Sequence, residues 1–356
     1  MRPGVRDTPA PHRGRAPRLE GAANRHLARW LWTRGWRTAI EPYPGYGAPG
    51  WIRVLARTVL SPPRPDGLVE RRRRRRGWRS LVTVPVTGAV VEVRLGSRVH
   101  RVTSDRGGYV DAVVPADLAP GWHDVDLSVS TACVTAPVHV TAPVLVIDPA
   151  ARSGIVSDID DTVMVTSAPW PLLAAWNTFV RSEDARRPVP GMADLYQRLL
   201  RADPRAPVLY VSTEAWNAAP ALGRFLRRHG YPAGPLLLTD WGPTRTGWFR
   251  DGADHKRAAL RRLTREFPQV RWLLVGDDGQ RDPEIYAELA AEQPDRVRAL
   301  AIRQVADADP AKPRAPGLDD ARGIRRRAAD AGVAIVTERD GTRLAERLRD
   351  AGIDLG

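Results

Sequence analysis

The stretch Gly154-Ile155-Val156-Ser157-Asp158-Ile159-Asp160-Asp161-Thr162 decides how the rest of the chain is interpreted. An apolar run leads into two carboxylates that are separated by one residue. Because side chains along a strand alternate between its faces, Asp158 and Asp160 are expected to leave a strand end on the same side. Two adjacent carboxylates are unfavourable unless a cation or a shared proton relieves their repulsion. An isolated pair of this kind is equally compatible with an acidic turn, so its meaning depends on residues further along the chain.

Polar residues also follow two later apolar strands. Ser212 and Thr213 come directly after one of them, where a hydroxyl group can donate to a phosphate oxygen or simply cap the strand. Asp277 follows the other, and Asp282 begins the next helix. Clustered hard oxygen ligands of this kind suit Mg²⁺.

Lys256 is one of two lysines in a chain whose basic residues are otherwise arginines. It opens a predicted helix, where the helix dipole disfavours a cation. A surface lysine is the ordinary interpretation. A compact positive charge chosen at this position also suits a phosphoryl oxygen.

Strands and amphipathic helices alternate from residue 150 onward, which is typical of a doubly wound parallel α/β fold. Such folds bind ligands at the carboxyl ends of their strands. Predicted strands cover residues 154–157, 207–212, 235–238, 271–275, 298–302 and 333–336; predicted helices cover 192–200, 218–229, 254–267, 283–292, 319–331 and 342–351.

These elements together resemble the haloacid-dehalogenase superfamily of aspartyl-nucleophile phosphatases. The superfamily pattern is D-x-D-x-T, then Ser or Thr at a strand end, then Lys, then Gly-Asp with further acid. More narrowly, the segments SDIDDTV, YVSTEAWN, DHK and VGDDGQRDPEIY are similar to the App1-type phosphatidate phosphatase domain. STEAW stands where fungal-type members more often have Ser-Asn-Ser-Pro-Trp.

The resemblance implies a role for each matching residue. Asp158 is the expected nucleophile, and Asp160 the general acid and later the general base. Ser212, Thr213 and Lys256 are expected to bind the phosphoryl group. Mg²⁺ is the expected cofactor, and its expected ligands are Asp158, Asp160 (through the backbone carbonyl), Asp277 and Asp282.

The region before residue 150 predicts a different architecture. Short alternating strands with turn signals indicate a small antiparallel β-sandwich, of immunoglobulin-like or transthyretin-like type, over residues 41–148. Within it, the prolines and glycines of residues 41–50 predict a turn, and an Arg-rich loop is predicted at residues 61–80. A disordered basic arm over residues 1–22 and a short amphipathic helix over residues 23–40 are expected to precede it.

The net charge of +14 lies entirely in the first 80 residues, which contain 19 arginines and five acidic residues. Such a segment attracts anionic surfaces, either acidic lipid or nucleic acid, although a run such as 71–76 is more often a solvated loop. A single cysteine, Cys133, fits a reducing compartment. We therefore expect a cytoplasmic protein that binds the inner face of the membrane peripherally, with no obligate protein partner.

The leading prediction is a Mg²⁺-dependent phosphomonoesterase that converts phosphatidate to diacylglycerol and phosphate. Two alternatives stay open at this point. One is a polynucleotide-end phosphatase whose basic arm binds nucleic acid. The other is a non-catalytic lipid-binding module, although binding alone does not require a nucleophile and an acid.

Overall fold

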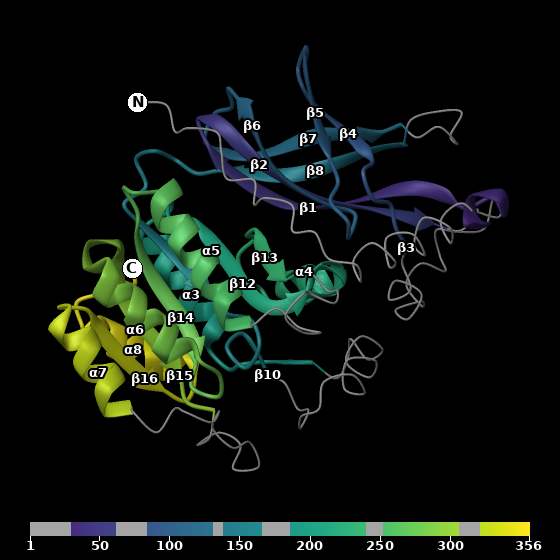
Figure 1. Cartoon of the computed structure of the whole chain (residues 1–356). Helices are drawn as coiled ribbons and strands as arrows, with labels where there is room; N and C mark the ends of the chain where they lie inside the picture. Colours follow the sequence, from purple (N-terminus) through teal and green to yellow (C-terminus); the bar gives the residue numbers. More distant parts are fainter. Residues whose placement is uncertain (1–29, 62–83, 131–137, 166–185, 240–251, 306–320) are drawn as a thin grey trace.

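The computed structural model describes residues 30–61, 84–130, 138–165, 186–239, 252–305 and 321–356. A strand-only region and a region of alternating strands and helices lie against each other (Figure 1). The basic arm at 1–22, most of the loop at 61–80 with the arginines at 71–76, and Cys133 lie outside the described residues.

The first region is one curled sheet of eight strands. Its order is β3-β2-β1-β8-β7-β4-β5, and β6 pairs with β2. The strands are β1 (Arg37–Ala48), β2 (Gly50–Ser61), β3 (Val84–Pro85), β4 (Val90–Leu95), β5 (Arg98–Thr103), β6 (Tyr109–Ala116), β7 (Gly121–Val129) and β8 (Val138–Val146). Neighbouring strands are antiparallel except β1 and β8, which pair in parallel at residues 45–47. The sequence predicted an antiparallel β-sandwich; the described strands instead form one sheet, and this one pairing is parallel.

Strand β1 corrects the prediction for residues 37–48; residues 30–33 are helical, as predicted. The proline-rich and glycine-rich run at 41–50 is turn-like in sequence, yet β1 begins at Arg37, inside the expected helix, and pairs with β2. Its register shifts between Tyr43 and Tyr46, so the strand accommodates Pro44 as a bulge rather than as a break. Burial of the Tyr43 and Tyr46 side chains supplies the stabilisation that local propensity lacks.

The second region contains a six-stranded sheet in which every neighbouring pair is parallel. The order is β13-β12-β9-β14-β15-β16, which places β9 (Ser153–Ser157) in the interior. The other strands are β12 (Val208–Ala215), β13 (Leu236–Thr239), β14 (Arg271–Asp277), β15 (Val297–Arg303) and β16 (Ala334–Glu338). A separate two-stranded sheet pairs β10 (Met164–Val165) with β11 (Arg187–Pro188). The parallel strands predicted from the sequence are therefore confirmed.

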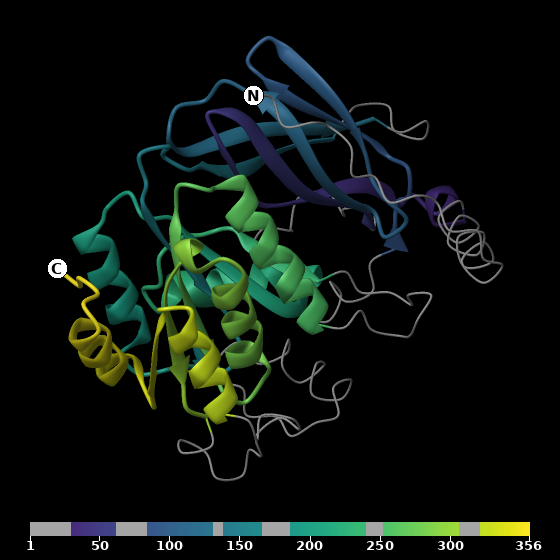
Figure 2. The ribbon, with the colours of Figure 1, turned by 60° about the vertical axis from the view of Figure 1, so that its left-hand side comes forward.

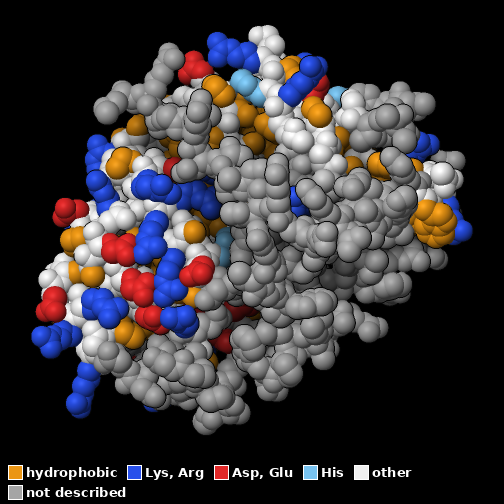
Figure 3. Space-filling view, in the orientation of Figure 1, with side chains coloured by type: hydrophobic (Ala, Val, Ile, Leu, Met, Phe, Trp, Pro, Cys, Tyr) orange, Lys and Arg blue, Asp and Glu red, His pale blue; other side chains and the backbone are white. Residues whose placement is uncertain are grey.

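Helices lie on both sides of this sheet. They are α3 (Met192–Ala202), α4 (Ala219–Arg228), α5 (Gly252–Glu266), α6 (Asp282–Glu292), α7 (Ala321–Asp330) and α8 (Gly341–Asp350). α3 packs against α8, whereas α6 packs between α5 and α7, and the two groups stand apart in Figure 2. Basic and acidic side chains are interspersed over α5, α6 and α7 (Figure 3), as the balanced charge of residues 81–356 predicts. No described helix has the length and apolarity that crossing a bilayer requires.

One hydrophobic core spans the two regions. Tyr43, Tyr46 and Leu55 from the first sheet belong to the same buried cluster as Ile155 and Trp272 from the second. The first sheet also has a core of its own, which includes Ile52, Val93 and Leu127. Burial of apolar surface between the regions therefore fixes the first sheet against the second.

We expect Gly154→Ala to destabilise the protein by about 1–3 kcal/mol, because it overpacks a well-filled core. A Cβ at this position would lie 2.5 Å from Cζ3 of Trp272. Gly223→Ala in α4 is the matched control, because nothing lies within 4 Å of its added Cβ. That change should stabilise the helix by about 0.4–1 kcal/mol. Urea unfolding measures both values, and equal stabilities for the two variants would contradict this packing.

Candidate active site

The two aspartates of the opening stretch follow β9 at its carboxyl end. The Asp158 backbone N–H donates to the Val275 carbonyl at 2.8 Å, which extends the β9–β14 ladder to the expected nucleophile. The chain then turns: Asp161 has φ +54°, and its N–H donates to Met164 O at 2.7 Å. Asp161 is the one non-glycine with positive φ among the described residues. Asp158 and Asp160 are both buried.

Asp158 lies against the positive charge that the sequence identified. Lys256 Nζ lies 2.7 Å from Asp158 Oδ1, and Thr162 Oγ1 donates to Asp158 Oδ2 at 3.1 Å. Lys256 is buried and also contacts Asp282 Oδ1 at 2.6 Å. Burial disfavours its charge, but Asp158 and Asp282 together raise the pKa of Lys256, so the ammonium form persists.

Asp160 has separate partners on β12. Ser212 Oγ donates to Asp160 Oδ2 at 3.1 Å and accepts from the Glu214 N–H at 3.0 Å. Burial raises the pKa of Asp160 to about 6, with Asp161 adding to the rise and the Ser212 hydrogen bond opposing it. A carboxyl group with this pKa can both donate and accept a proton near neutral pH.

The third acidic position lies at the end of β14. Asp277 Oδ1 accepts from the N–H groups of Gly279 at 2.8 Å and Gln280 at 3.1 Å. Within the described residues, Asp277 Oδ2 and Asp282 Oδ2 are buried without a hydrogen-bond partner. Burial, Asp282 and Asp158 raise the pKa of Asp277 well above its usual value. Burial likewise raises the pKa of Asp158, with Lys256 opposing and Asp282 adding to the rise.

This arrangement fits a divalent cation. Asp158, Asp277 and Asp282 each offer a carboxylate oxygen, and these oxygens lie within 4.8 Å of one another. With Asp160 they make four carboxylates, and their negative charge exceeds the positive charges of Lys256 and Arg186 that act on them. Carboxylates buried in excess of cations favour either protonation or a bound metal ion, and hard oxygen donors suit Mg²⁺.

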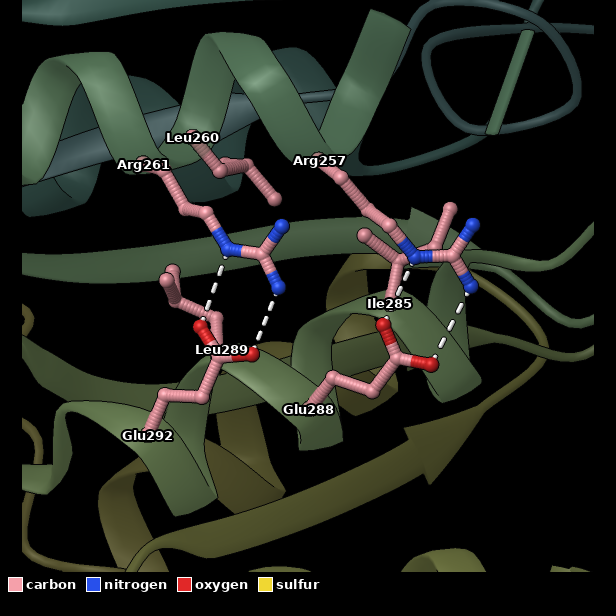
Figure 4. Close-up of a pocket in the computed structure, with 7 residues that line it drawn as sticks. All are labelled: Arg257, Leu260, Arg261, Ile285, Glu288, Leu289 and Glu292. Carbon is pink, nitrogen blue, oxygen red and sulfur yellow. Dashed lines mark hydrogen bonds and ion pairs between the residues drawn. The ribbon is translucent and has the colours of Figure 1, made fainter. Parts of the chain in front are cut away.

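Two ion pairs fix the helices that carry Lys256 and Asp282 (Figure 4). Arg257 contacts Glu288 at 2.7 Å, and one turn later Arg261 contacts Glu292 at 2.5 Å. Because these pairs run along α5 and α6, they hold the two helices side by side. The contact between Lys256 and Asp282 is thus supported from outside the site.

Six of the seven predicted site residues are brought together: Asp158, Asp160, Ser212, Lys256, Asp277 and Asp282. Thr213 differs, because its Cγ2 methyl group packs against Gly252, 2.5 Å from where a Cβ on that glycine would lie. Its carbonyl accepts a hydrogen bond from Thr239, which is not a predicted site residue. Thr213 therefore supports the start of α5.

The sequence interpretation missed two charged residues beside Asp160. Arg186 is buried, and its positive charge opposes the rise in the Asp160 pKa. Burial and the negative charge of Asp160 raise the pKa of Glu214, and the positive charge of Arg186 opposes this rise. In the sequence, Glu214 stands out only as an acidic residue in the segment STEAW. Nothing in the sequence around Arg186 indicated that it lies near Asp160.

Comparison with known families confirms the predicted resemblance for one part of the chain. Residues 153–304 match the family model described as "Phosphatidate phosphatase APP1, catalytic domain". This segment contains all seven predicted site residues. The chain is also 24% identical over 228 residues to phosphatidate phosphatase APP1 of Saccharomyces cerevisiae, a match that covers 62% of this chain and 38% of that protein.

Further similarities include a second curated relative and a solved structure. An uncharacterized protein of Schizosaccharomyces pombe is 29% identical over 157 residues, which cover 43% of this chain and 26% of that one. The chain therefore spans well under half the length of the curated relatives it matches. Among solved structures, the HAD domain of the effector protein Lem4 from Legionella pneumophila matches with a TM-score of 0.33 and 13% identity, over 58% of this chain and 97% of that domain.

We expect Asp277→Asn to raise the melting temperature of the metal-free protein. The folded-state pKa of Asp277 is raised, so the folded state binds more protons than the unfolded state, and stability falls as pH rises above the ordinary carboxyl range. At pH 7.5 in EDTA the gain should be at least about 2 °C, which corresponds to roughly 1 kcal/mol.

Adding Mg²⁺ should raise the melting temperature of the wild type and leave that of Asp277→Asn nearly unchanged. The exposed acid Asp330, in α7, supplies the control variant Asp330→Asn, which should respond to Mg²⁺ as the wild type does. An equal Mg²⁺ response in Asp277→Asn and the wild type would rule out Asp277 as a ligand.

Proposed function

We propose that this protein is a Mg²⁺-dependent phosphomonoesterase that acts through an aspartyl-phosphate on Asp158. The observation that carries the proposal is the buried contact of Asp158 with Lys256 at 2.7 Å, beside an Asp160 that is hydrogen-bonded to Ser212. A nucleophile, an acid and two phosphate-binding groups thus meet at the carboxyl ends of adjacent strands. The match of residues 153–304 to a phosphatase catalytic family supports the same chemistry, and a doubly wound fold of haloacid-dehalogenase type.

In the first step an Asp158 carboxylate oxygen attacks phosphorus, and the bond from phosphorus to the leaving oxygen breaks. Asp160 donates its proton to that oxygen, so the alcohol leaves neutral. Lys256 and the Ser212 hydroxyl bind non-bridging phosphoryl oxygens and offset the charge that develops on them. Burial raises the pKa of Asp158, and the charge of Lys256 opposes that rise, which favours the ionised form of the nucleophile.

In the second step a water molecule attacks phosphorus, and the bond between phosphorus and Asp158 breaks. Asp160, now ionised, accepts the proton of the water. Inorganic phosphate leaves, and both aspartates return to their starting protonation states.

Asp158, Asp277 and Asp282 would hold the Mg²⁺, together with the Asp160 backbone carbonyl. The ion supplies positive charge to the phosphoryl oxygens and to the nucleophile. The chain's own contribution is to direct buried carboxylate oxygens at one place, among them Asp277 Oδ2 and Asp282 Oδ2, which have no hydrogen-bond partner within the described residues.

Phosphatidate is the substrate we favour, because the family model and the budding-yeast relative both carry that activity in their names. The 19 arginines of residues 1–80 would attract an anionic membrane surface, consistent with a cytoplasmic protein that binds membranes peripherally. A polynucleotide-end phosphatase and a non-catalytic lipid-binding module are the alternatives, and a comparison of substrates separates them.

We expect Mg²⁺-dependent phosphate release from phosphatidate vesicles, and slower release from a 3′-phosphorylated oligonucleotide and from a soluble phosphomonoester. Asp158→Asn should lower kcat by at least about a thousandfold, because nucleophile removal is among the most costly changes. Ser212→Ala should lower it about a hundredfold, as loss of one oxyanion donor does. Release from the oligonucleotide alone would overturn the lipid substrate, and binding of vesicles without phosphate release would favour the non-catalytic alternative.

The rate should also depend on pH through Asp160. With an alkyl phosphate, kcat/KM should fall as pH rises through about 6, because the general acid must be protonated to act. With p-nitrophenyl phosphate the fall should be shallower, since that leaving group needs no proton. Profiles from about pH 5 to 8.5 at saturating Mg²⁺ test this, because the range brackets the pKa of the acid. Two profiles of equal steepness would contradict the role given to Asp160.

A further inference from the structure

An aromatic pair joins the first sheet to the end of strand β12. The ring of Tyr43 in β1 stacks on that of Trp216, with centroids 4.7 Å apart and planes inclined by 26°. Both side chains are buried and belong to the core that joins the two regions. Trp216 lies four residues after Ser212, directly beyond the end of β12.

The segment between Ser212 and Trp216 is an irregular part of its sheet. β12 pairs with β13 up to Val211, opposite Leu237, and pairs again only at Ala215, opposite Thr239. Residues 212–214 therefore receive no regular pairing from β13. The Thr239 hydroxyl donates to the carbonyls of residues 213 and 214 at 2.8 and 3.1 Å, which anchors the far end of the segment.

The Ser212 hydroxyl depends on this segment for its orientation. It accepts from the Glu214 N–H at 3.0 Å and donates to Asp160 at 3.1 Å. A shift of Ala215 and Trp216 would displace the Glu214 N–H. The Ser212 hydroxyl would then lose the hydrogen bond that orients it. Misplacement of a catalytic group by about 1 Å can cost roughly a hundredfold in rate.

We propose that Tyr43 is a positioning residue for Ser212, acting through the Trp216 ring. The first sheet is then a part of the catalytic apparatus rather than an independent module. The inference rests on the proposed phosphatase function, because Ser212 acts there as the phosphoryl-binding hydroxyl. It assigns to a residue in the first sheet the task of fixing where Ser212 Oγ points in the second.

Tyr46 provides a matched comparison, because it also joins the two regions but contacts the carboxyl end of α5 instead of the end of β12. Its hydroxyl donates to Glu266 at 2.8 Å, and its ring lies 5.9 Å from that of Phe267. Glu266 ends α5, about 15 Å along the helix from Lys256 at roughly 1.5 Å per residue. Loss of Tyr46 should therefore weaken the contact between the regions without moving the residues that bind phosphate.

The test is a double-mutant cycle in the full chain. Tyr43→Ala, Tyr43→Phe and Tyr46→Ala are each made in the wild type and in Ser212→Ala, and kcat, KM and melting temperature are measured. If Tyr43→Ala fails to fold, Tyr43→Leu provides the same comparison, because it keeps apolar volume and loses the stack. Orthovanadate affinity, measured by calorimetry, supplies a readout that needs no substrate.

Tyr43→Ala should lower kcat about tenfold in the wild type but less than about twofold in Ser212→Ala, because residues that act through one another are not additive. Tyr43→Phe keeps the stacked ring and should stay within about twofold of the wild type. Tyr46→Ala should lower the melting temperature at least as much as Tyr43→Ala, yet change kcat by less than about twofold.

Equal losses of kcat from Tyr43→Ala in both backgrounds, or equal losses from Tyr43→Ala and Tyr46→Ala, would overturn the inference. Failure of the proposed function gives a different result: the wild type itself would release no phosphate. In that case vanadate affinity decides: the inference requires Tyr43→Ala to weaken it only when Ser212 is present. A wild type that neither releases phosphate nor binds vanadate would overturn both proposals.

Discussion

The four buried aspartates of the active site carry more negative charge than the neighbouring positive charges offset, and the rest of the structure depends on this imbalance. Asp158, Asp160, Asp277 and Asp282 are all buried, and Lys256 is the one ammonium group that contacts them among the described residues. Charged groups removed from water are costly unless they are paired, so the fold must stabilise this cluster from outside. It does so with backbone N–H groups at Asp277, hydroxyl groups at Asp158 and Asp160, and the ion pairs between α5 and α6. Under the proposed function a cation completes the compensation.

The cluster is assembled from segments that lie far apart in the chain. Strands β9, β12 and β14 are neighbours in the sheet, so their carboxyl ends bring Asp158, Ser212 and Asp277 to one edge. The first sheet adds a second level of support. It packs on α5 through Tyr46, and on the end of β12 through Tyr43. A site that tolerates little displacement is thus built on two sheets that share one core.

Much of this was readable from the sequence, for identifiable reasons. Buried parallel strands are continuous apolar runs, so the polar residue that ends each run marks the ligand-binding edge. Arg186 and Glu214 were missed because their importance comes from proximity to Asp160, which no local pattern encodes. Strand β1 was missed because its prolines and glycines resemble a turn, while its stability comes from β2 and from buried tyrosines. The parallel pairing of β1 with β8 is a contact between distant segments, and alternation of apolar residues carries no information on it.

The central claim is that Asp158 becomes phosphorylated, and trapping that intermediate tests it most directly. The Asp160→Asn variant should form the intermediate from acetyl phosphate, whose leaving group needs no proton, and should hydrolyse it slowly because the general base is absent. Acid quenching and then peptide mass spectrometry locate the phosphoryl group. We expect a phosphorylated peptide that contains Asp158 and that loses its phosphoryl group on treatment with hydroxylamine. Phosphate release without a covalent phosphoryl group, or a phosphoryl group on any other residue, would contradict it.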